Sequence, residues 1–288
     1  MPSMTTTPKV IIFTDLDGTL LDRDTYSFAP AQSALDVIRK KGIPLVFSSS
    51  KTRAEIELYR ERAGNDHPFI AENGGAVFVP SRYFSFRFPY DRECDGYLVF
   101  ELGTLHVKLV ETLNVVKKET GISIKGFSDL SKEELFSLCG LSGTEAEFAR
   151  KREYDEPFII EGKESHVDVV RRKIEEKGMQ YAWGGRFHHI LGNNDKGKAV
   201  EILKELYENQ FFSISTLGIG DSTNDYPMLA AVDHPFLLRD KESSLPKVPS
   251  GEPAWVIVDG TGPAVWNKVI LNFLECRRNG SGGDDRCG

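Results

Sequence analysis

Short, largely apolar runs recur in the first and last thirds of the chain, and each stops at polar or turn-forming residues. They span residues 10–13, 43–47, 68–71 and 215–219. Runs of this length without alternation are typical of strands buried on both faces of a parallel sheet. Residues 30–41 separate the first two runs and carry apolar side chains at helical spacing. This order of strand, helix and strand predicts an α/β domain with a parallel sheet.

Further elements extend this domain. Thr52 and Glu55 form a capping-box pattern, which predicts a helix over residues 53–62. Two glycines predict a tight reversal over residues 72–75, with Asn73 in the turn. The remaining elements are a strand over residues 76–79, a helix that begins near Asp195, strands over 235–238 and 256–258, and a helix over 263–274.

The pattern changes between residues 87 and 192. Strands are predicted over residues 97–102, 123–127, 157–161 and 179–183, and helices over 104–119 and 164–177. Capping boxes at Ser131 with Glu134 and at Ser142 with Glu145 predict two short helices. These elements do not alternate as in a doubly wound sheet, so we interpret them as an inserted α+β layer that acts as a lid.

The predicted division of the chain follows from this change of pattern. A discontinuous core covers residues 9–86 and 192–276, and an inserted cap covers residues 87–191. Residues 277–288 are polar and rich in glycine, so we expect them to form a disordered tail.

Composition narrows the classes of partner. The chain has 288 residues, of which 40% are hydrophobic, and a formal net charge of -7. This length suits one large or two ordinary domains with a sizeable core. The negative charge argues against non-specific binding to nucleic acid or to anionic membranes. No apolar run reaches the roughly 20 residues of a membrane span.

The amino terminus and the cysteines are the sequence features that relate to the cellular compartment of the protein. The first seven residues show no basic and apolar secretory pattern, so we expect a cytoplasmic protein. The four cysteines are widely separated and lack metal-ligand spacing, which predicts neither a zinc site nor a disulfide framework. Both expectations fit a reducing compartment.

Two carboxylates follow the first apolar run. Asp15 and Asp17 are two positions apart, and Gly18 allows the backbone to turn sharply. Ligands of open α/β sheets bind at the carboxyl ends of the strands, so we expect both acids at the mouth of a crevice. Neighbouring carboxylates repel each other unless a cation or a shared proton offsets the repulsion, which favours a divalent metal. The alternative is a simple polar turn, which Asp and Gly commonly form.

Hydroxyl and basic side chains follow the second run. They are contributed by Ser48, Ser49, Ser50, Lys51 and Arg53. Serine hydroxyls beside the free N–H groups of a helix amino terminus form a suitable phosphate site. An ordinary helix cap would explain one hydroxyl, but not three followed by two bases.

Acids also follow the run at residues 215–219. Asp221 precedes the turn, so we expect it to point toward Asp15. Asn224 and Asp225 come later and are also compatible with a helix cap.

The predicted lid contains one candidate binding segment. Arg186, His188 and His189 follow two glycines at residues 184–185. A guanidinium suits bidentate capture of a carboxylate or phosphate, which favours a functional role for Arg186 over a surface ion pair. Packing on a strand explains either histidine equally well. We interpret the charged stretch at residues 150–157 as a solvated helix end.

Four motifs in fixed order resemble those of the haloacid dehalogenase-like phosphatases. They are D-L-D-G-T-L-L from Asp15, a strand-end hydroxyl at Ser49, Lys196, and G-D-S-T-N-D around Asp221. The resemblance covers the whole core, and the insert between the second and third motifs is similar to the C2 cap of that family. It implies a Rossmann-like α/β core with a parallel sheet and an inserted α+β cap.

The resemblance implies a role for each motif. Asp15 would be the nucleophile that becomes phosphorylated, and Asp17 would protonate the leaving oxygen and later activate water. Ser49 and Lys196 would hold the phosphate oxygens, with Ser48 or Ser50 as the alternative hydroxyl. The implied cofactor is Mg²⁺, bound by Asp15, the backbone carbonyl of Asp17, and Asp221. Asn224 and Asp225 would be supporting residues, and Asp225 is expected to orient Lys196 or a metal-bound water.

Further stretches resemble a subgroup of that family, the mannosyl-3-phosphoglycerate phosphatases. They are S-S-K-T-R at residues 49–53, E-N-G-G at 72–75, R-E-Y-D-E-P-F at 152–158, G-G-R-F-H-H at 184–189 and D-K-G-K-A-V at 195–200. Cap-bearing relatives usually have T-G-R after the second strand, where this chain has Ser49, Ser50 and Lys51. The resemblance implies substrate-binding roles for Lys51, Arg53, Asn73, Gly74, Arg186 and His188.

The resulting prediction is a Mg²⁺-dependent phosphatase of a small sugar phosphate, with mannosyl-3-phosphoglycerate as the implied substrate and an aspartyl phosphate as the intermediate. Glucosyl-3-phosphoglycerate or another sugar phosphate, such as sucrose phosphate, stays open as an alternative. A phosphomutase and a catalytically silent sugar-phosphate-binding regulator are less favoured. A silent regulator would be expected to lack Asp17 or Asp221, and both are present. The oligomeric state stays open.

Overall fold

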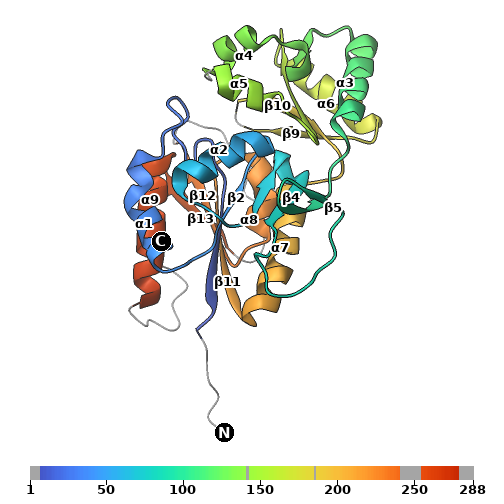
Figure 1. The fold of residues 1–288 in the computed structure, drawn as a ribbon. Coiled ribbons are helices and arrows are strands. Elements are labelled where there is room, and N and C mark those ends of the chain that lie inside the picture. The colour runs from blue at the N-terminus through green and yellow to red at the C-terminus, as the bar shows by residue number, and fades with distance from the viewer. Residues whose placement is uncertain (1–6, 141–142, 185, 241–253, 279–288) are drawn as a thin grey trace.

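The computed structural model describes residues 7–140, 143–184, 186–240 and 254–278. In these ranges the chain forms a large unit and a smaller unit that stands over one end of it (Figure 1). The large unit is built on a nine-stranded sheet with the strand order β13-β12-β11-β1-β2-β3-β4-β6-β5.

Six neighbouring strands of this sheet run parallel, as the apolar runs predicted. They are β1 (Lys9–Thr14), β2 (Leu45–Ser48), β3 (Phe69–Ala71), β11 (Ile214–Gly220), β12 (His234–Arg239) and β13 (Val256–Asp259). The antiparallel strands at the other end of the sheet are β4 (Ala76–Pro80), β5 (Arg92–Cys94) and β6 (Tyr97–Glu101).

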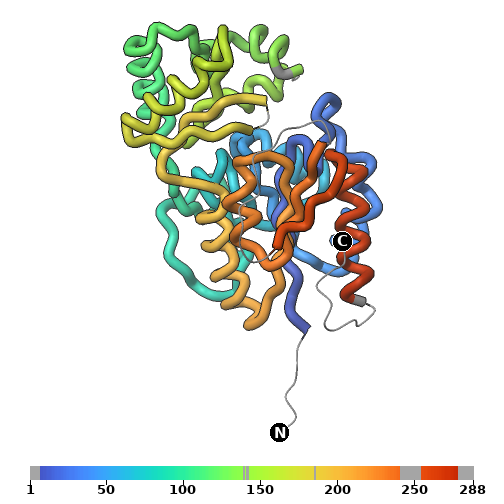
Figure 2. The backbone as a smooth tube through the Cα atoms, turned by 180° about the vertical axis from the view of Figure 1, so that it is seen from behind, coloured from blue at the N-terminus to red at the C-terminus, as the bar shows by residue number. Residues whose placement is uncertain are grey.

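Helices cover both faces of the parallel strands, which is why these strands are apolar without alternation (Figure 1 and Figure 2). Ile12 and Phe47 face one set of helices, and Ile11 and Val46 face the other. The first set is α1 (Gln32–Lys40), α2 (Arg53–Ala63) and α9 (Pro263–Arg278), and the second set is α7 (Lys196–Phe211) and α8 (Tyr226–Ala230).

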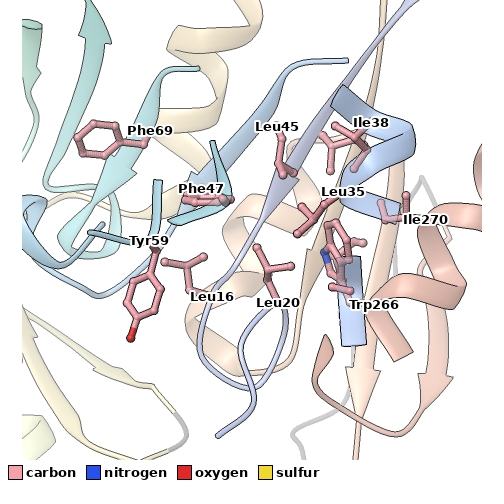
Figure 3. Packing of buried hydrophobic residues seen from close by; sticks show 14 of the residues in the cluster. Leu16, Leu20, Leu35, Ile38, Leu45, Phe47, Tyr59, Phe69, Trp266 and Ile270 are labelled. Atoms are coloured by element: carbon pink, nitrogen blue, oxygen red, sulfur yellow. The ribbon is translucent and has the colours of Figure 1, made fainter. Parts of the chain in front are cut away.

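The loop after β1 is anchored in the first of these cores. Leu16 and Leu20 pack in one cluster with Trp266 of α9 (Figure 3). Trp266 also donates from Nε1 to Thr14 Oγ1 at 3.0 Å. The two acids on either side of Leu16 therefore project from a backbone that core packing holds in place.

The smaller unit has a four-stranded antiparallel sheet with the order β7-β8-β10-β9. Its strands are β7 (Ile124–Gly126), β8 (Asp155–Ile160), β9 (Gln180–Trp183) and β10 (His188–Leu191). Phe158 and Ile190 of this sheet pack against α3 and α6. The helices are α3 (His106–Thr120), α4 (Lys132–Cys139), α5 (Gly143–Ala149) and α6 (Ser165–Glu176). We call the segment from α3 through β10 the cap, and the large unit the core.

Short 3₁₀ helices complete the described elements. They are η1 (Ala29–Ala31), η2 (Glu72–Gly74), η3 (Phe127–Asp129) and η4 (Thr223–Asp225).

Most predicted elements are found with small shifts at their ends, but two boundaries differ from expectation. β6 lies beyond residue 87 and pairs with β4 in the large sheet, so the core sheet continues past the position where we expected the cap to begin. Val99 of β6 is fully buried in the first core cluster, which explains this placement. α9 continues to Arg278, two residues into the predicted tail. Ser142 and residues 279–288 lie outside the described residues.

Cysteine pairing also differs from expectation. Cys276 in α9 is disulfide-bonded, although the spacing of the cysteines predicted no disulfide framework. Spacing along the chain does not report distances in the fold. Cys94 is a free thiol. Among the described helices, none combines the length and the hydropathy of a membrane span.

Candidate active site

Three strand ends meet at one edge of the core sheet. β1 lies between β11 and β2, and all three strands run parallel. The segments that follow them carry Asp15, Asp221 and Ser49, so these residues emerge at the same edge. The backbone N–H of Asp15 continues the pairing by donating to the carbonyl oxygen of Ile219 at 2.9 Å.

Lys196 reaches this edge from the first turn of α7. Its Nζ donates to Asp15 Oδ1 and to Asp225 Oδ1, each at 2.6 Å, and its side chain is fully buried. Asp195 caps the helix by accepting the backbone N–H of Lys198 at 2.9 Å. The cap residue fixes where α7 begins, and so where the ammonium group lies.

Asp225 connects Lys196 to the loop that carries Asp221. Its second oxygen, Oδ2, accepts the backbone N–H groups of Asp221 and Ser222, each at 3.0 Å. Ser222 Oγ in turn donates to Asn224 Oδ1 at 2.5 Å. Asp225 therefore contacts the residue that it was expected to orient, and Asn224 belongs to the same loop network.

Burial and mutual repulsion shift the ionisation of these acids. Burial raises the pKa of Asp15 well above its ordinary value, Lys196 opposes this shift, and Asp225 and Asp221 add to it. Burial and Asp225 raise the pKa of Asp221 to about 6, against the opposing charge of Arg23. The site therefore concentrates negative charge that additional positive charge would stabilise.

The acidic residues fit a divalent cation. One carboxylate oxygen each from Asp15, Asp221 and Asp225 lie within 4.8 Å of one another, and all three residues are buried. A donor set made only of oxygens matches the preference of Mg²⁺. The guanidinium of Arg23 forms an ion pair with Asp221, and Lys196 forms one with Asp15, so cationic side chains balance part of this charge.

Gly18 allows the two loops to approach each other. Its φ is +78°, a conformation that favours glycine. A Cβ at this position would lie 2.4 Å from Asp221 Oδ2 and 2.6 Å from Arg23 Nε. Any other residue at this position would strain the backbone and displace the side chains of Asp221 and Arg23.

Asp17 is not part of the cluster of three carboxylates and pairs with Lys51 instead. Its Oδ2 lies 3.0 Å from Lys51 Nζ, and its Oδ1 has no hydrogen-bond partner among the described residues. Lys51 is buried, 3.7 Å from Glu55 Oε1 and 4.8 Å from the ring centroid of Tyr26. Asp17 and Glu55 hold the pKa of Lys51 above its ordinary value against the opposing effect of burial.

The three serines after β2 differ in their surroundings. Ser49 Oγ accepts the backbone N–H of Lys51 at 3.2 Å. Ser48 Oγ is buried and has no hydrogen-bond partner among the described residues. Ser50 accepts a hydrogen bond from Arg152 Nη1 on its carbonyl oxygen at 2.6 Å. Ser49 therefore lies directly after the end of β2, and its side-chain oxygen is held by the backbone of the following loop.

Asn73 and Gly74 support the site from η2 instead of lining the cavity. Asn73 has a φ of 57°, donates from Nδ2 to Asp155 Oδ2 at 2.9 Å, and accepts from Asn224 Nδ2 on Oδ1 at 2.9 Å. A Cβ at Gly74 would lie 2.1 Å from the carbonyl oxygen of Asp195. Gly74 therefore allows η2 to pack directly on the start of α7.

A cavity of about 290 Å³ lies between the core and the cap. Both units contribute positively charged side chains to its lining, which suits an anionic ligand. The acidic and basic lining residues are Asp17, Arg23, Asp24, Lys51 and Glu55 from the core, and Arg152, Arg186 and His189 from the cap.

Arg186 lines this cavity, and its role in binding the substrate stays a prediction. It donates from Nη2 to the carbonyl oxygen of Leu138 and from Nη1 to the hydroxyl of Tyr26 at 3.4 Å. Its guanidinium lies 5.5 Å from the ring centroid of Phe187. The segment around Arg186 therefore connects α4 of the cap to the loop after β1.

Two residues that the sequence assigned to the substrate lie elsewhere. Arg53 pairs with Asp95 at 2.8 Å and does not line the cavity. His188 stacks on Phe158 at 5.4 Å between ring centroids, on the helix-covered face of the cap sheet. Neighbouring residues on a strand face opposite sides, so His189 faces the core and lines the cavity in place of His188.

Arg152 is a site residue that the sequence interpretation missed. The stretch around it was interpreted as a solvated helix end, but Arg152 is buried with its guanidinium 3.6 Å from Asp155 and 3.8 Å from Glu55. Its hydrogen bond to the Ser50 carbonyl connects the cap to the loop after β2. Local sequence pattern does not distinguish a buried arginine from a solvated one. The feature of the sequence that could have indicated a functional role for Arg152 was its place in the R-E-Y-D-E-P-F stretch of the family resemblance.

Comparisons with known proteins agree with this geometry. Residues 12–248 match the model of a family described as haloacid dehalogenase-like hydrolase. A protein of Methanococcoides burtonii named glucosyl-3-phosphoglycerate/mannosyl-3-phosphoglycerate phosphatase is 43% identical over 94% of this chain and 99% of its own. A mannosyl-3-phosphoglycerate phosphatase of Pyrococcus furiosus is 38% identical over 80% of this chain and 91% of its own.

Solved structures show the same fold. A haloacid dehalogenase subclass IIB sugar phosphatase superimposes with a TM-score of 0.61 at 15% identity, over 91% of this chain and 98% of its own. The family match covers most of the chain, and the relatives align along nearly their whole length. The chain therefore belongs to the haloacid dehalogenase-like hydrolases, as its four motifs predicted, and is an enzyme of that family.

Proposed function

We propose that this chain is a Mg²⁺-dependent phosphatase that hydrolyses mannosyl-3-phosphoglycerate to mannosylglycerate and phosphate, and that it accepts glucosyl-3-phosphoglycerate as a second substrate. The observation that carries the proposal is the buried ion pair of Asp15 with Lys196, which lies beside Asp221. Two residues after Asp15, Asp17 lines a cavity with several positively charged side chains. The names of the relatives support the substrate, since one covers both esters and the other covers the mannosyl ester.

The first half-reaction transfers the phosphoryl group to the protein. A carboxylate oxygen of Asp15 attacks phosphorus, and the bond from phosphorus to the glycerate oxygen breaks. Asp17 donates its proton to that oxygen, so the glycosylglycerate leaves as an alcohol. Lys196 and the Ser49 hydroxyl stabilise the charge on the non-bridging oxygens, and Asp225 holds the ammonium in place.

The second half-reaction returns Asp15 to its starting state. Water attacks the phosphorus of the aspartyl phosphate, Asp17 accepts its proton, and inorganic phosphate leaves. Lys51, at 3.0 Å from Asp17, stabilises the carboxylate form that Asp17 has after the first half-reaction. The cap covers the cavity and limits the access of other water molecules to the ester.

Asp15, the backbone carbonyl of Asp17, and Asp221 are the groups that would hold Mg²⁺. When bound, Mg²⁺ supplies positive charge that offsets the repulsion between these carboxylates and the phosphate. Asp225 is the supporting residue in this proposal because its oxygens already accept Lys196 and two backbone N–H groups.

Phosphate release from purified protein tests the proposal. We expect release from both glycerate esters in the presence of Mg²⁺, loss of release in EDTA, and recovery when Mg²⁺ is restored. Release of phosphate from sucrose phosphate but from neither glycerate ester would contradict the proposed substrate and support the proposed reaction. An isomerised sugar phosphate without free phosphate would indicate a phosphomutase, and binding without turnover would indicate a regulator.

A further inference from the structure

His189 presents only one of its two ring nitrogens to the protein. It lies in β10, is 3% exposed, and lines the cavity. Its Nδ1 lies 2.9 and 3.0 Å from the two carboxylate oxygens of Asp155. No hydrogen bond to Nε2 is found within the part of the chain that the structure describes. Nδ1 is therefore held by Asp155, whereas Nε2 is left for a ligand in the cavity that His189 lines.

Asp155 determines which nitrogen of His189 carries the proton. The carboxylate of Asp155 accepts a hydrogen bond from Asn73 Nδ2 at 2.9 Å and is fully buried. A carboxylate that accepts from Nδ1 fixes the tautomer of the neutral imidazole with its proton on Nδ1. Nε2 is then a hydrogen-bond acceptor.

The ring is held in this orientation from the core side as well. Asn73 accepts from Asn224, and Asn224 accepts from Ser222 in the loop that follows Asp221. At Gly184 a Cβ would lie 2.8 Å from His189 Nε2, so a larger residue at that position would cover the nitrogen. The network therefore orients His189, and the glycine leaves Nε2 uncovered.

His189 supplies the one hydrogen-bond acceptor among the described cap side chains that line the cavity. The others are Phe127, Ala149, Arg152, Pro157, Arg186 and Phe187. The two arginines suit the phosphate or the carboxylate of a phosphoglycerate ester, but they cannot accept a hydrogen bond. A glycosyl group presents hydroxyl donors, which need an acceptor.

We propose that His189, oriented by Asp155, binds a hydroxyl of the substrate's glycosyl group through Nε2. This inference rests on the proposed function and assigns a specificity-determining residue to it. His189 touches the substrate, whereas Asp155 is a positioning residue that acts through His189.

Steady-state kinetics on two esters test this assignment. The measured quantity is the ratio of kcat/KM for mannosyl-3-phosphoglycerate to kcat/KM for p-nitrophenyl phosphate, which has no glycosyl hydroxyls. His189→Phe keeps a ring but removes the acceptor, and we expect the ratio to fall by about tenfold, chiefly through KM for the glycosyl ester. Thermal unfolding of each variant reports whether it is folded.

Asp155→Asn tests the role of the tautomer. The asparagine amide would donate to Nδ1, which moves the proton of His189 to Nε2 and turns the acceptor into a donor. We expect the same fall in the ratio. The variant also removes the negative charge that lies 3.6 Å from Arg152, so its fall is assigned to the tautomer when it matches that of His189→Phe. An unchanged ratio in this variant counts against the assignment even if His189→Phe does not fold.

His188→Phe is the matched control, because the same substitution is made one residue away on the opposite face of the strand. We expect its ratio to stay within about twofold of wild type. An unchanged ratio in His189→Phe, an equal fall in His188→Phe, or an unchanged ratio in Asp155→Asn would overturn the assignment. Failure of the proposed function is separate: the wild type would then release no phosphate from the glycerate ester, and the ratio would be measured with the sugar phosphate that it does hydrolyse.

Discussion

The core and the cap contribute to the cavity region in different ways. In the core, Asp15, Lys196 and Asp225 are buried and paired at 2.6 Å. In the cap, Arg186 is exposed and donates to a backbone carbonyl, that of Leu138, and to the hydroxyl of Tyr26. The charged groups of the core cluster are buried beside one another, whereas the side chain of Arg186 is exposed to solvent.

This difference separates the chemistry from recognition. Buried, preorganised charges stabilise a transition state without reorganising during the reaction, and removing the shared cation Lys196 leaves the carboxylates beside it uncompensated. A partly solvated arginine contributes mainly to binding, and its removal leaves the fold nearly unchanged. Substitutions in the core should therefore change turnover or stability, and those in the cap should change substrate affinity.

The largest expected effect is that of Asp15→Asn. Loss of the nucleophile should lower kcat by more than about 10³-fold. The free energy of unfolding should not fall, because the substitution removes one of three repelling carboxylates. Phosphate release and thermal unfolding measure the two quantities. Asp36→Asn, at an exposed ion pair with Arg39, is the control, and turnover above a tenth of the wild-type rate would place the nucleophile elsewhere.

Lys196→Met should mainly lower stability. It leaves Asp15 and Asp225 buried without their shared partner, so we expect the free energy of unfolding to fall by about 3–5 kcal/mol. Lys198→Met, two residues along the same helix at a half-exposed ion pair, should cost less than about 1 kcal/mol. Urea unfolding of both variants measures their free energies of unfolding. Equal decreases in the two variants would show that the buried ion pairs of Lys196 contribute no more to stability than the exposed pair of Lys198.

Glu72 lies where the core contacts the cap, and its ionisation should make the stability of the protein depend on pH. Its carboxylate accepts the backbone N–H groups of Glu153 at 3.0 Å and Tyr154 at 2.8 Å. Burial raises its pKa from the ordinary 4.5 to about 8, against the opposing charge of Arg152. Above the ordinary pKa the unfolded chain loses this proton while the folded chain keeps it, so stability should fall as pH rises from about 4.5 through about 8.

Glu72→Gln removes this dependence because an amide does not ionise. The wild type should lose up to about 1.4 kcal/mol per pH unit relative to the variant across that interval. Urea unfolding of both proteins at several pH values measures the difference. Parallel stability curves would show that Glu72 is ionised in the folded protein.

The smallest expected effect is that of Arg186→Ala. Loss of one partly solvated guanidinium should raise KM for the glycerate ester by about fivefold with little change in kcat. Arg53→Ala is the matched control, because Arg53 pairs with Asp95 outside the cavity, and its KM should stay within about twofold of wild type. Equal effects of both substitutions on KM would contradict the division between a catalytic core and a recognising cap.

The sequence by itself determined the α/β core and the convergence of its strand-end residues. Parallel strands deliver their carboxyl ends to one edge of a sheet, so the order of the motifs was enough to bring Asp15, Ser49 and Asp221 together. Lys196, which lies at the start of the helix that follows the cap, was assigned from the family resemblance of its motif. These inferences depend on local pattern and on the topology that the pattern requires.

The tertiary structure alone decided which side chains of the inserted region reach the cavity. Alternation along β10 requires that His188 and His189 face opposite sides, but only the packing of α3 and α6 on one face shows which histidine faces the core. Arg152 is a site residue because Ser50 and Glu55, about a hundred positions away, surround it, and Arg53 is not one because Asp95 lies beside it. Burial and pairing of a charge depend on distant segments of the chain, and a local pattern contains no information about them.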